Sequence, residues 1–196
     1  MEFKEEIDAI SLIESVIKPE SVVEVEIMND PEFIEGAMLG EPRRGHPEGK
    51  IIYHIEEVLA NVDKCTAQAP ESRKMLRFVA LIHDTFKHKV DYTKPKVGEN
   101  HHAMIARRFA EKYTKDLVIL DIIELHDEAY NAYSMGVRKD NWKGAVERID
   151  RLRKRLGYWL GVYMIFYWCD NNTGDKTQEN YEWFEEQIKI ANENES

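Results

Sequence analysis

Histidine and aspartate residues stand at the ends of the most apolar stretches of the chain. His83 and Asp84 directly follow the apolar residues 78–82, and Asp170 closes the apolar run that begins at Tyr158. A polar or charged side chain at such a position is costly to bury unless it is paired or coordinated. Imidazole and carboxylate groups together suit divalent first-row metals. These positions therefore predict a metal site inside a folded domain.

A metal held by such residues would suit the hydrolysis of a phosphate ester. A bound divalent ion lowers the pKa of a water molecule to roughly 7, so that hydroxide is available to attack phosphorus at neutral pH. Lys87 lies one helical turn beyond His83 and shares its face. An ammonium group at that place can meet a phosphoryl oxygen. We therefore predict Asp84 and Lys87 as catalytic residues.

Further histidines occupy positions that suit metal ligands. His54 lies inside an amphipathic helix, and His126 follows another apolar run. His101 and His102 open a helix after a loop that contains Pro and Gly, and the sequence leaves open which of the two is a ligand. Asp150, the nearest alternative to Asp170, stands among arginines and is expected in a solvated ion pair.

Helices must position these residues, because apolar residues recur with a period near 3.6 through most of the chain. Pro and Gly residues mark the expected ends. Residues 22–27 alternate like a strand, but a lone strand has no partner, so we expect a helix or an extended linker there. The other predicted helices cover residues 3–17, 48–64, 75–82, 101–113, 115–130, 143–170 (with a break near Gly157 left open) and 180–192.

The pattern predicts one all-α domain, a bundle of five to eight helices. Residues 45–176 form the predicted metal-binding core. Residues 1–44 are expected to form a helix and linker packed on that core, and residues 177–196 a C-terminal helix and a frayed tail. The aromatic residues between Tyr158 and Trp168 are expected in the core.

Composition and charge exclude several classes of protein. With 37 acidic and 27 basic residues, the chain has a formal net charge of -10. Duplex nucleic acid is therefore not an expected partner, because its binding relies on an excess of Lys and Arg. The longest apolar stretch has about a dozen residues, whereas a membrane span needs roughly 20. Two cysteines without a pairing motif and an acidic N-terminus favour a cytoplasmic protein.

The order of these residues resembles that of the HD superfamily of metal-dependent phosphohydrolases, in which a lone His, a His-Asp doublet, further His residues and a distal Asp lie on a helical bundle. The resemblance covers roughly residues 45–176. It is most detailed with the HD domain of bacterial CCA-adding tRNA nucleotidyltransferases. It rests on the His-Pro-Glu element at 46–48, the helix that ends in the doublet 83–84, the Glu-Leu-His-Asp element at 124–127 and the turn after Asp170.

This sequence departs from that family's pattern in two ways. Phe86 stands where the family often has Gly between the doublet and the lysine. The chain also shows no nucleotidyltransferase domain, so CCA addition itself is not expected.

The resemblance implies hydrolysis of a phosphomonoester or phosphodiester bond in a nucleotide or a related small anionic molecule. It implies one or two divalent ions per chain, of Mn, Mg, Fe, Co, Ni or Zn. His54, His83, Asp84 and Asp170 would hold the first ion. His126, with His101 or His102, would hold a second ion that Asp84 bridges to the first, and the spacing to Ala106 slightly favours His101 as the family-like position.

Two other functions share these residues. Some proteins that resemble this one in their ligands hold two irons and oxidise their substrates with dioxygen. A degenerate domain that only binds a nucleotide or a partner is the non-enzymatic alternative, and the complete set of ligands argues against it. The sequence leaves open the substrate, the native metal and whether the protein forms a homodimer.

Overall fold

The computed structural model describes residues 2–193, so the end of the predicted C-terminal tail lies outside the described residues. These residues form eleven α-helices and no β-strand, which confirms the prediction of a single all-α domain. The helices are α1 (Glu2–Ile17), α2 (Val22–Met28), α3 (Pro31–Ala37), α4 (Ile51–Cys65), α5 (Pro70–Ile82), α6 (His102–Ala110), α7 (Leu117–Leu125), α8 (Glu128–Tyr133), α9 (Trp142–Leu156), α10 (Leu160–Asn171) and α11 (Glu179–Glu193).

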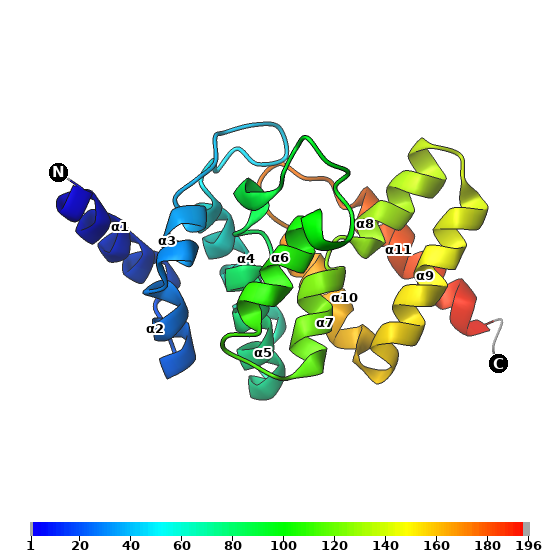
Figure 1. Cartoon of the computed structure of the whole chain (residues 1–196). Helices are drawn as coiled ribbons and strands as arrows, with labels where there is room; N and C mark the ends of the chain where they lie inside the picture. Colours follow the sequence, from blue (N-terminus) through cyan, green and yellow to red (C-terminus); the bar gives the residue numbers. More distant parts are fainter. Residues whose placement is uncertain (1, 194–196) are drawn as a thin grey trace.

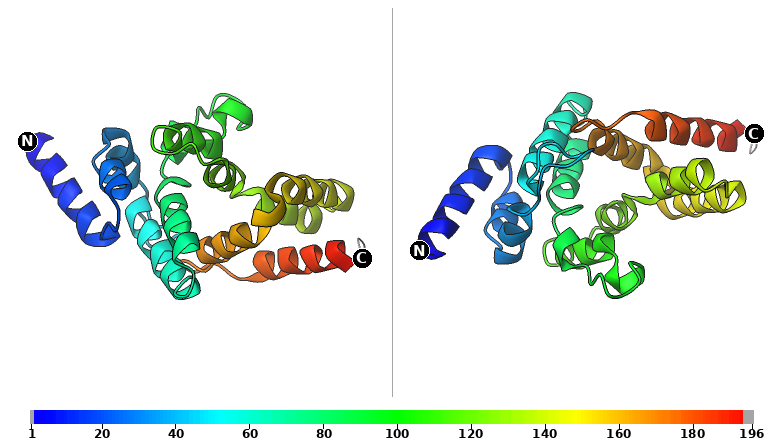
Figure 2. Two further views of the ribbon diagram at one scale, coloured as in Figure 1. Left: turned by 90° about the horizontal axis from the view of Figure 1, so that it is seen from below. Right: turned by 90° about the horizontal axis from the view of Figure 1, so that it is seen from above.

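The helices lie in three groups along the molecule (Figure 1). Helices α1 to α3 form one end, α4 to α7 and α10 form the middle, and α8, α9 and α11 form the other end. Helices α1 and α11 therefore lie at opposite ends of the molecule (Figure 2). Helix α4 packs against α5 and α10, α6 against α7, and α8 against α9 and α11. None of the helices that residues 2–193 form is long and apolar enough to cross a membrane.

A buried ion pair joins the N-terminal helices to the middle group. Glu24 of α2 is 2% exposed and Arg77 of α5 is 3% exposed. The Arg77 guanidinium donates to both Glu24 carboxylate oxygens at 3.0 Å, and to the Ile17 carbonyl oxygen at 3.2 Å. Residues 22–27 alternate like a strand, and the sequence left a helix or an extended linker open there. The segment is a helix, and its first turn is capped by the Ser21 side chain.

Helix α3 approaches the residues after α5 very closely. A β-carbon built on Gly36 would lie 2.1 Å from the Thr85 carbonyl oxygen and 3.0 Å from the His88 ring. Only a glycine permits this approach without a shift of one backbone relative to the other. The N-terminal helices are therefore packed directly against the turn that follows His83 and Asp84.

The predicted helix over residues 115–130 is interrupted, because α7 ends at Leu125 and α8 begins at Glu128. The hydroxyl of the fully buried Tyr163 accepts a hydrogen bond from the Ala129 N–H at 3.1 Å. It also lies 3.1 Å from the carbonyl oxygen of Leu125, to which it can donate. Tyr163 thus satisfies backbone groups that the break leaves without helical partners. Residues 115–130 contain no Pro or Gly, so the sequence gives no signal of this break.

A second break separates α9 from α10, at the place that the sequence left open. Gly157 has a φ of +50° and ends α9. Tyr158 is 92% exposed and Trp159 is 37% exposed. The prediction that all aromatic residues of this segment are core residues is therefore wrong for these two, because the turn carries them outward. The two breaks and the short helices α2 and α3 also raise the number of helices above the predicted five to eight.

We expect Arg77→Met to lower the free energy of unfolding by about 3–5 kcal/mol, because the Glu24 carboxylate would remain buried without its cationic partner. Lys189→Met is the matched control, because Lys189 is 59% exposed in its pair with Glu185 and surface pairs contribute little. Urea unfolding followed by circular dichroism measures both variants. Equal losses of stability would contradict the role of the buried pair.

Candidate metal centre

Two histidines and two aspartates from three helices form a first group of donor atoms. His54 lies within α4, His83 and Asp84 directly follow α5, and Asp170 lies in the last turn of α10. The Nε2 atoms of His54 and His83 are 3.4 Å apart. Asp170 Oδ1 is 3.1 Å from the first nitrogen and 3.8 Å from the second. Asp84 Oδ2 is 3.8 Å from each of them.

A second group of donors lies on the other side of Asp84. Asp84 Oδ1 is 3.3 Å from His126 Nε2 and 3.6 Å from His102 Nε2. These two nitrogens are 3.2 Å apart, and Asp127 Oδ2 is 3.1 Å from His102 Nε2. The two oxygens of Asp84 are therefore directed to different donor groups. This is the arrangement of a carboxylate that bridges two ions.

The donor atoms fit divalent metal ions in their spacing and burial. Ligand atoms that share one ion at about 2.1 Å lie roughly 3–3.5 Å from one another, and the shortest distances within each group fall in that range. Asp84 Oδ1 is buried without a hydrogen-bond partner. A buried carboxylate oxygen without such a partner is rare, and a bound cation would satisfy it.

Backbone carbonyl groups orient two of the imidazoles. His83 Nδ1 lies 3.1 Å from the Ala80 carbonyl oxygen, and His126 Nδ1 lies 2.8 Å from that of Ile123. Because a carbonyl oxygen only accepts, Nδ1 is the donor in each case. In each imidazole, Nε2 is then the atom left to bind a metal.

Two lysines compensate the buried carboxylates. Lys87 forms an ion pair with Asp84, and Lys176 Nζ lies 3.1 Å from Asp170 Oδ1. Burial opposes ionisation of both carboxyl groups, but the charges of Lys87 and Lys176 hold the pKa of Asp84 and of Asp170 well below their ordinary values. Burial also opposes the charge of Lys87, yet the Asp84 carboxylate raises the pKa of that ammonium group. Anionic donors and adjacent cations are therefore both present at neutral pH.

The second donor group holds a proton when no metal is bound. Burial would favour neutral imidazole, but the Asp127 and Asp84 carboxylates raise the pKa of His126 to about 9. Against the effect of burial, the His126 and His102 side chains hold the pKa of Asp127 below its ordinary value. A metal ion entering this group would displace the proton of His126.

The structure places His101 and His102 differently. His102 approaches Asp84 and His126 at the distances given above. His101 Nδ1 accepts a hydrogen bond from the Ala103 N–H at 3.3 Å, and so caps the start of α6. His101 still belongs to a looser group with His102 and Asp127, in which all donor atoms lie within 4.8 Å of one another. Of the two histidines, His102 has the position of a ligand beside Asp84.

Glu48 is a site residue that the sequence reasoning missed. Its Oε1 lies 2.8 Å from His46 Nδ1 and 3.4 Å from His54 Nδ1, and its side chain is 5% exposed. Burial opposes the charge, but His54 and His46 lower the pKa of Glu48 to about 2. Glu48 therefore stands behind His54, in the position of a carboxylate that could orient a metal-binding imidazole, although His54 Nδ1 makes no hydrogen bond of ordinary geometry here. Its signal in the sequence is the His-Pro-Glu element, eight residues before His54. Asp127, also missed, repeats the His-Asp doublet after His126.

Phe86, which departs from the family pattern, is a core residue. It is fully buried and its ring centroid lies 4.4 Å from that of Phe109. Lys87 follows it at the start of the short helical turn Lys87–Lys89. The bulky residue thus fills the core beneath the turn and leaves Lys87 at the site.

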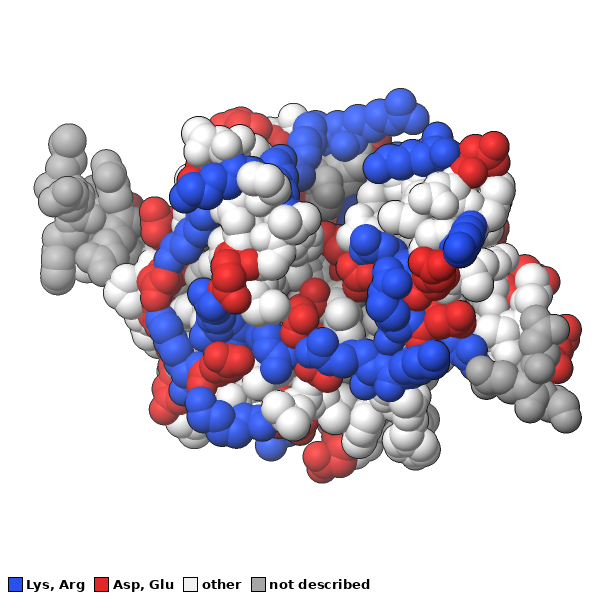
Figure 3. Space-filling view, turned by 45° about the vertical axis from the view of Figure 1, so that its right-hand side comes forward, with Lys and Arg blue, Asp and Glu red and all other residues white. Residues whose placement is uncertain are grey.

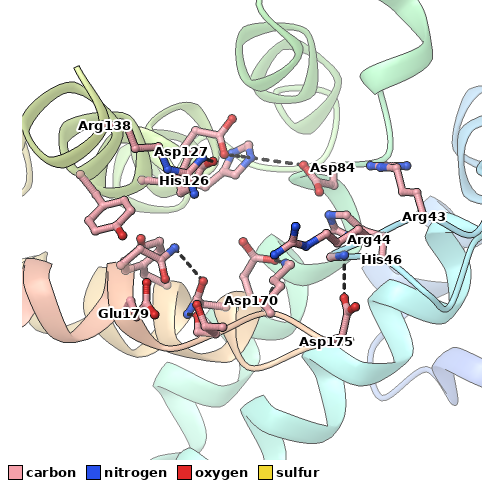
Figure 4. Close-up of a pocket in the computed structure, with 18 of the residues that line it drawn as sticks. Arg43, Arg44, His46, Asp84, His126, Asp127, Arg138, Asp170, Asp175 and Glu179 are labelled. Atoms are coloured by element: carbon pink, nitrogen blue, oxygen red, sulfur yellow. Dashed lines mark hydrogen bonds and ion pairs between the residues drawn. The ribbon is translucent and has the colours of Figure 1, made fainter.

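The donor groups open into a cavity of about 680 Å³. Figure 4 shows Asp84, His126, Asp127 and Asp170 around its middle, with Arg43 and Arg44 at one side and Arg138 at the opposite side. A second cavity of about 580 Å³ adjoins it and shares Arg43 and Lys87 with it. Lys and Arg side chains border a hollow in the upper part of the face in Figure 3. The larger cavity therefore brings carboxylates and imidazoles of the donor groups together with basic side chains.

We expect Glu48→Gln to weaken metal binding by roughly 10–100-fold, because His54 would lose the carboxylate that orients it. Glu56→Gln on α4 is the matched control, since Glu56 is exposed and faces away from the site. Calorimetric titration of the metal-free proteins with Mn²⁺ measures both affinities. An unchanged affinity in Glu48→Gln would contradict the orienting role.

Comparison with known proteins agrees with this arrangement of residues. The family model described as HD domain matches residues 51–157, which is more than half of the 196-residue chain. No curated protein and no solved structure matches the chain. The matched segment contains the His83-Asp84 doublet, His54, His102 and His126. The chain therefore belongs to the HD domain family.

Proposed function

We propose that the protein is a metal-dependent phosphohydrolase that cleaves a phosphoester bond of a small anionic molecule, with a nucleotide or a related compound as the substrate class. The observation that carries the proposal is the position of Asp84. Its two carboxylate oxygens face two separate groups of imidazole nitrogens at 3.3–3.8 Å. Membership of the HD domain family supports the same conclusion, since that family is typically hydrolytic.

His54, His83, Asp84 and Asp170 would hold one divalent ion, and Asp84, His102 and His126 a second. Ions bound there would supply Lewis-acid polarisation of a phosphoryl oxygen and of the attacking water. In the hydrolysis, an oxygen–phosphorus bond forms from water and the bond to the leaving oxygen breaks. The water gives up a proton, and the leaving oxygen takes one up.

Lys87 has the position to stabilise the phosphoryl group. Its ammonium lies beside Asp84 at the wall that the two cavities share. A phosphoryl oxygen entering the site would meet this charge, which offsets the negative charge that develops during attack. Lys176, paired with Asp170, places a second ammonium group on the other side of the first donor group.

The same donors also suit the two alternatives to a hydrolase. Two adjacent ions bridged by Asp84 would suit a di-iron oxygenase as well. An inactive binding domain is less consistent with a site in which every predicted ligand lies near another. Metal content separates these functions, because two irons with oxygen consumption and no hydrolysis would identify the oxygenase.

We expect purified protein to contain one to two equivalents of transition metal and to hydrolyse p-nitrophenyl phosphate or its bis ester. Asp84→Ala and Asp170→Ala should lose both metal and activity. Asp150→Ala is the matched control, since Asp150 is 46% exposed and lies outside the cavity. Elemental analysis and assays with each metal added back measure the effects. Absence of both metal and activity under every metal would overturn the proposal.

Lys87→Met should lower kcat by roughly 10²–10³-fold, the usual cost of removing one group that stabilises developing charge. Metal content should stay at the wild-type level, because Lys87 is not a ligand. Lys94→Met serves as the control for loss of a positive charge, since Lys94 is 70% exposed. Steady-state kinetics with p-nitrophenyl phosphate measures kcat in both variants. A kcat of Lys87→Met equal to that of wild type would show that Lys87 has no catalytic role.

A further inference from the structure

Three arginines line the larger cavity without a carboxylate partner. Arg43 and Arg44 lie on the loop before α4, and Arg138 ends the helical turn Ser134–Arg138. Among residues 2–193, the side chains of Arg43 and Arg44 make no ion pair and no hydrogen bond. The lysines of the same cavity are paired with Asp84 and Asp170, as described above. The cavity is lined by as many Asp and Glu residues as Lys and Arg residues, so these three arginines are distinguished by their lack of carboxylate partners and not by an excess of positive charge.

Arg138 is held in place by aromatic rings rather than by a carboxylate. Its Nη1 donates to the Tyr130 hydroxyl at 2.9 Å. Its guanidinium carbon lies 5.4 Å from the ring centroid of Tyr130 and 5.7 Å from that of Tyr133. Stacking on rings orients a guanidinium and leaves its remaining N–H groups available. Arg138 is thus prepared to donate hydrogen bonds to an anion that enters the cavity.

The charge of the chain makes the lack of pairing significant. A protein with a net charge of -10 has ample carboxylates to pair with exposed arginines. Around this cavity, Asp175 instead accepts a hydrogen bond from the Gly45 backbone N–H at 2.6 Å. The hydroxyl of Tyr167, a residue only 3% exposed, also lines the cavity and makes no hydrogen bond of ordinary geometry. A polar ligand in the cavity could satisfy the Tyr167 hydroxyl, because buried hydroxyl groups rarely lack a hydrogen-bond partner.

We propose that Arg43, Arg44 and Arg138 bind a further phosphate group of the substrate, beyond the one that is cleaved. The substrate class is then a small molecule with at least two phosphates, such as a nucleoside polyphosphate. This inference rests on the proposed function for the cleaved phosphate, which lies over Asp84 and Lys87.

Geometry and size support this substrate class. The arginines lie on opposite sides of the metal donors (Figure 4), so a ligand held at the donors can extend to either side. A planar guanidinium can donate two parallel hydrogen bonds to two oxygens of one phosphate group. A cavity of about 680 Å³ is in the size range of sites for ligands much larger than one phosphate ion.

Binding of inorganic tripolyphosphate and of orthophosphate tests this proposal. Both are titrated by calorimetry into the full chain at a fixed excess of free Mg²⁺, so that chelation is the same for every variant. We expect wild type to bind tripolyphosphate at least tenfold more tightly than orthophosphate. Arg138→Ala and the double variant Arg43→Ala, Arg44→Ala should each reduce this preference by roughly tenfold or more, because each removes charge-assisted hydrogen bonds.

Two control variants separate specific contacts from net charge. Lys139→Ala removes a neighbouring exposed charge that does not line the cavity, and it should leave the preference unchanged. Arg138→Lys keeps the charge without the planar fork and should restore only part of the preference. A loss in one of the two arginine groups alone would assign the further phosphate to that side.

The inference would be overturned if wild type bound both anions equally, or if no arginine variant changed the preference. This failure is distinct from failure of the proposed function. A protein that hydrolyses p-nitrophenyl phosphate but has no preference for tripolyphosphate contradicts only the phosphate subsite. A protein with an arginine-dependent preference that hydrolyses no ester supports the subsite and contradicts the hydrolase.

Discussion

Burial of the Asp84 carboxylate is the constraint on which the rest of the site depends. An ionised carboxylate that is 3% exposed is unstable in a protein interior unless cations and donors surround it. Imidazoles from α4, α6 and the end of α7 meet this requirement, together with Lys87. His102, His126 and Lys87 reach Asp84 because a helix begins, ends or breaks near each of them, whereas His54 lies within α4. The architecture of the bundle can therefore be understood as a set of helix termini gathered around one negative charge.

Periodicity was sufficient to predict the helical class and most helices, because apolar faces repeat along each of them. It also identified His83, Asp84, His126 and Asp170, since polar residues after apolar runs are conspicuous. Not every helix break could be predicted in this way, because some depend on tertiary contacts. The break after α7 depends on the Tyr163 hydroxyl, which lies 34 residues from Ala129 in the chain. No local pattern records such a contact.

The sequence left the choice between His101 and His102 open for a related reason. Adjacent residues at a helix start differ in direction by a large angle, and the cap geometry decides which of them faces inward. Glu48 belongs to the His-Pro-Glu element, but only the fold places its carboxylate behind His54, so the sequence reasoning assigned it no role at the site. The family match is also narrower than the site, since residues 51–157 include neither Glu48 nor Asp170. The donor set is completed by segments on both sides of the matched region.

Contact between Gly36 and Thr85 gives the site a mechanical property. A β-carbon at position 36 would lie 2.1 Å from the Thr85 carbonyl oxygen, so backbone meets backbone with no compressible side chain between them. Because a protein interior is closely packed and has low compressibility, a displacement of one segment is passed on to the segment that contacts it. A movement of α3 must therefore shift the turn that carries Asp84 and Lys87. Helices α2 and α3 act as a stiff support for the centre, although their residues are not among the donors described above.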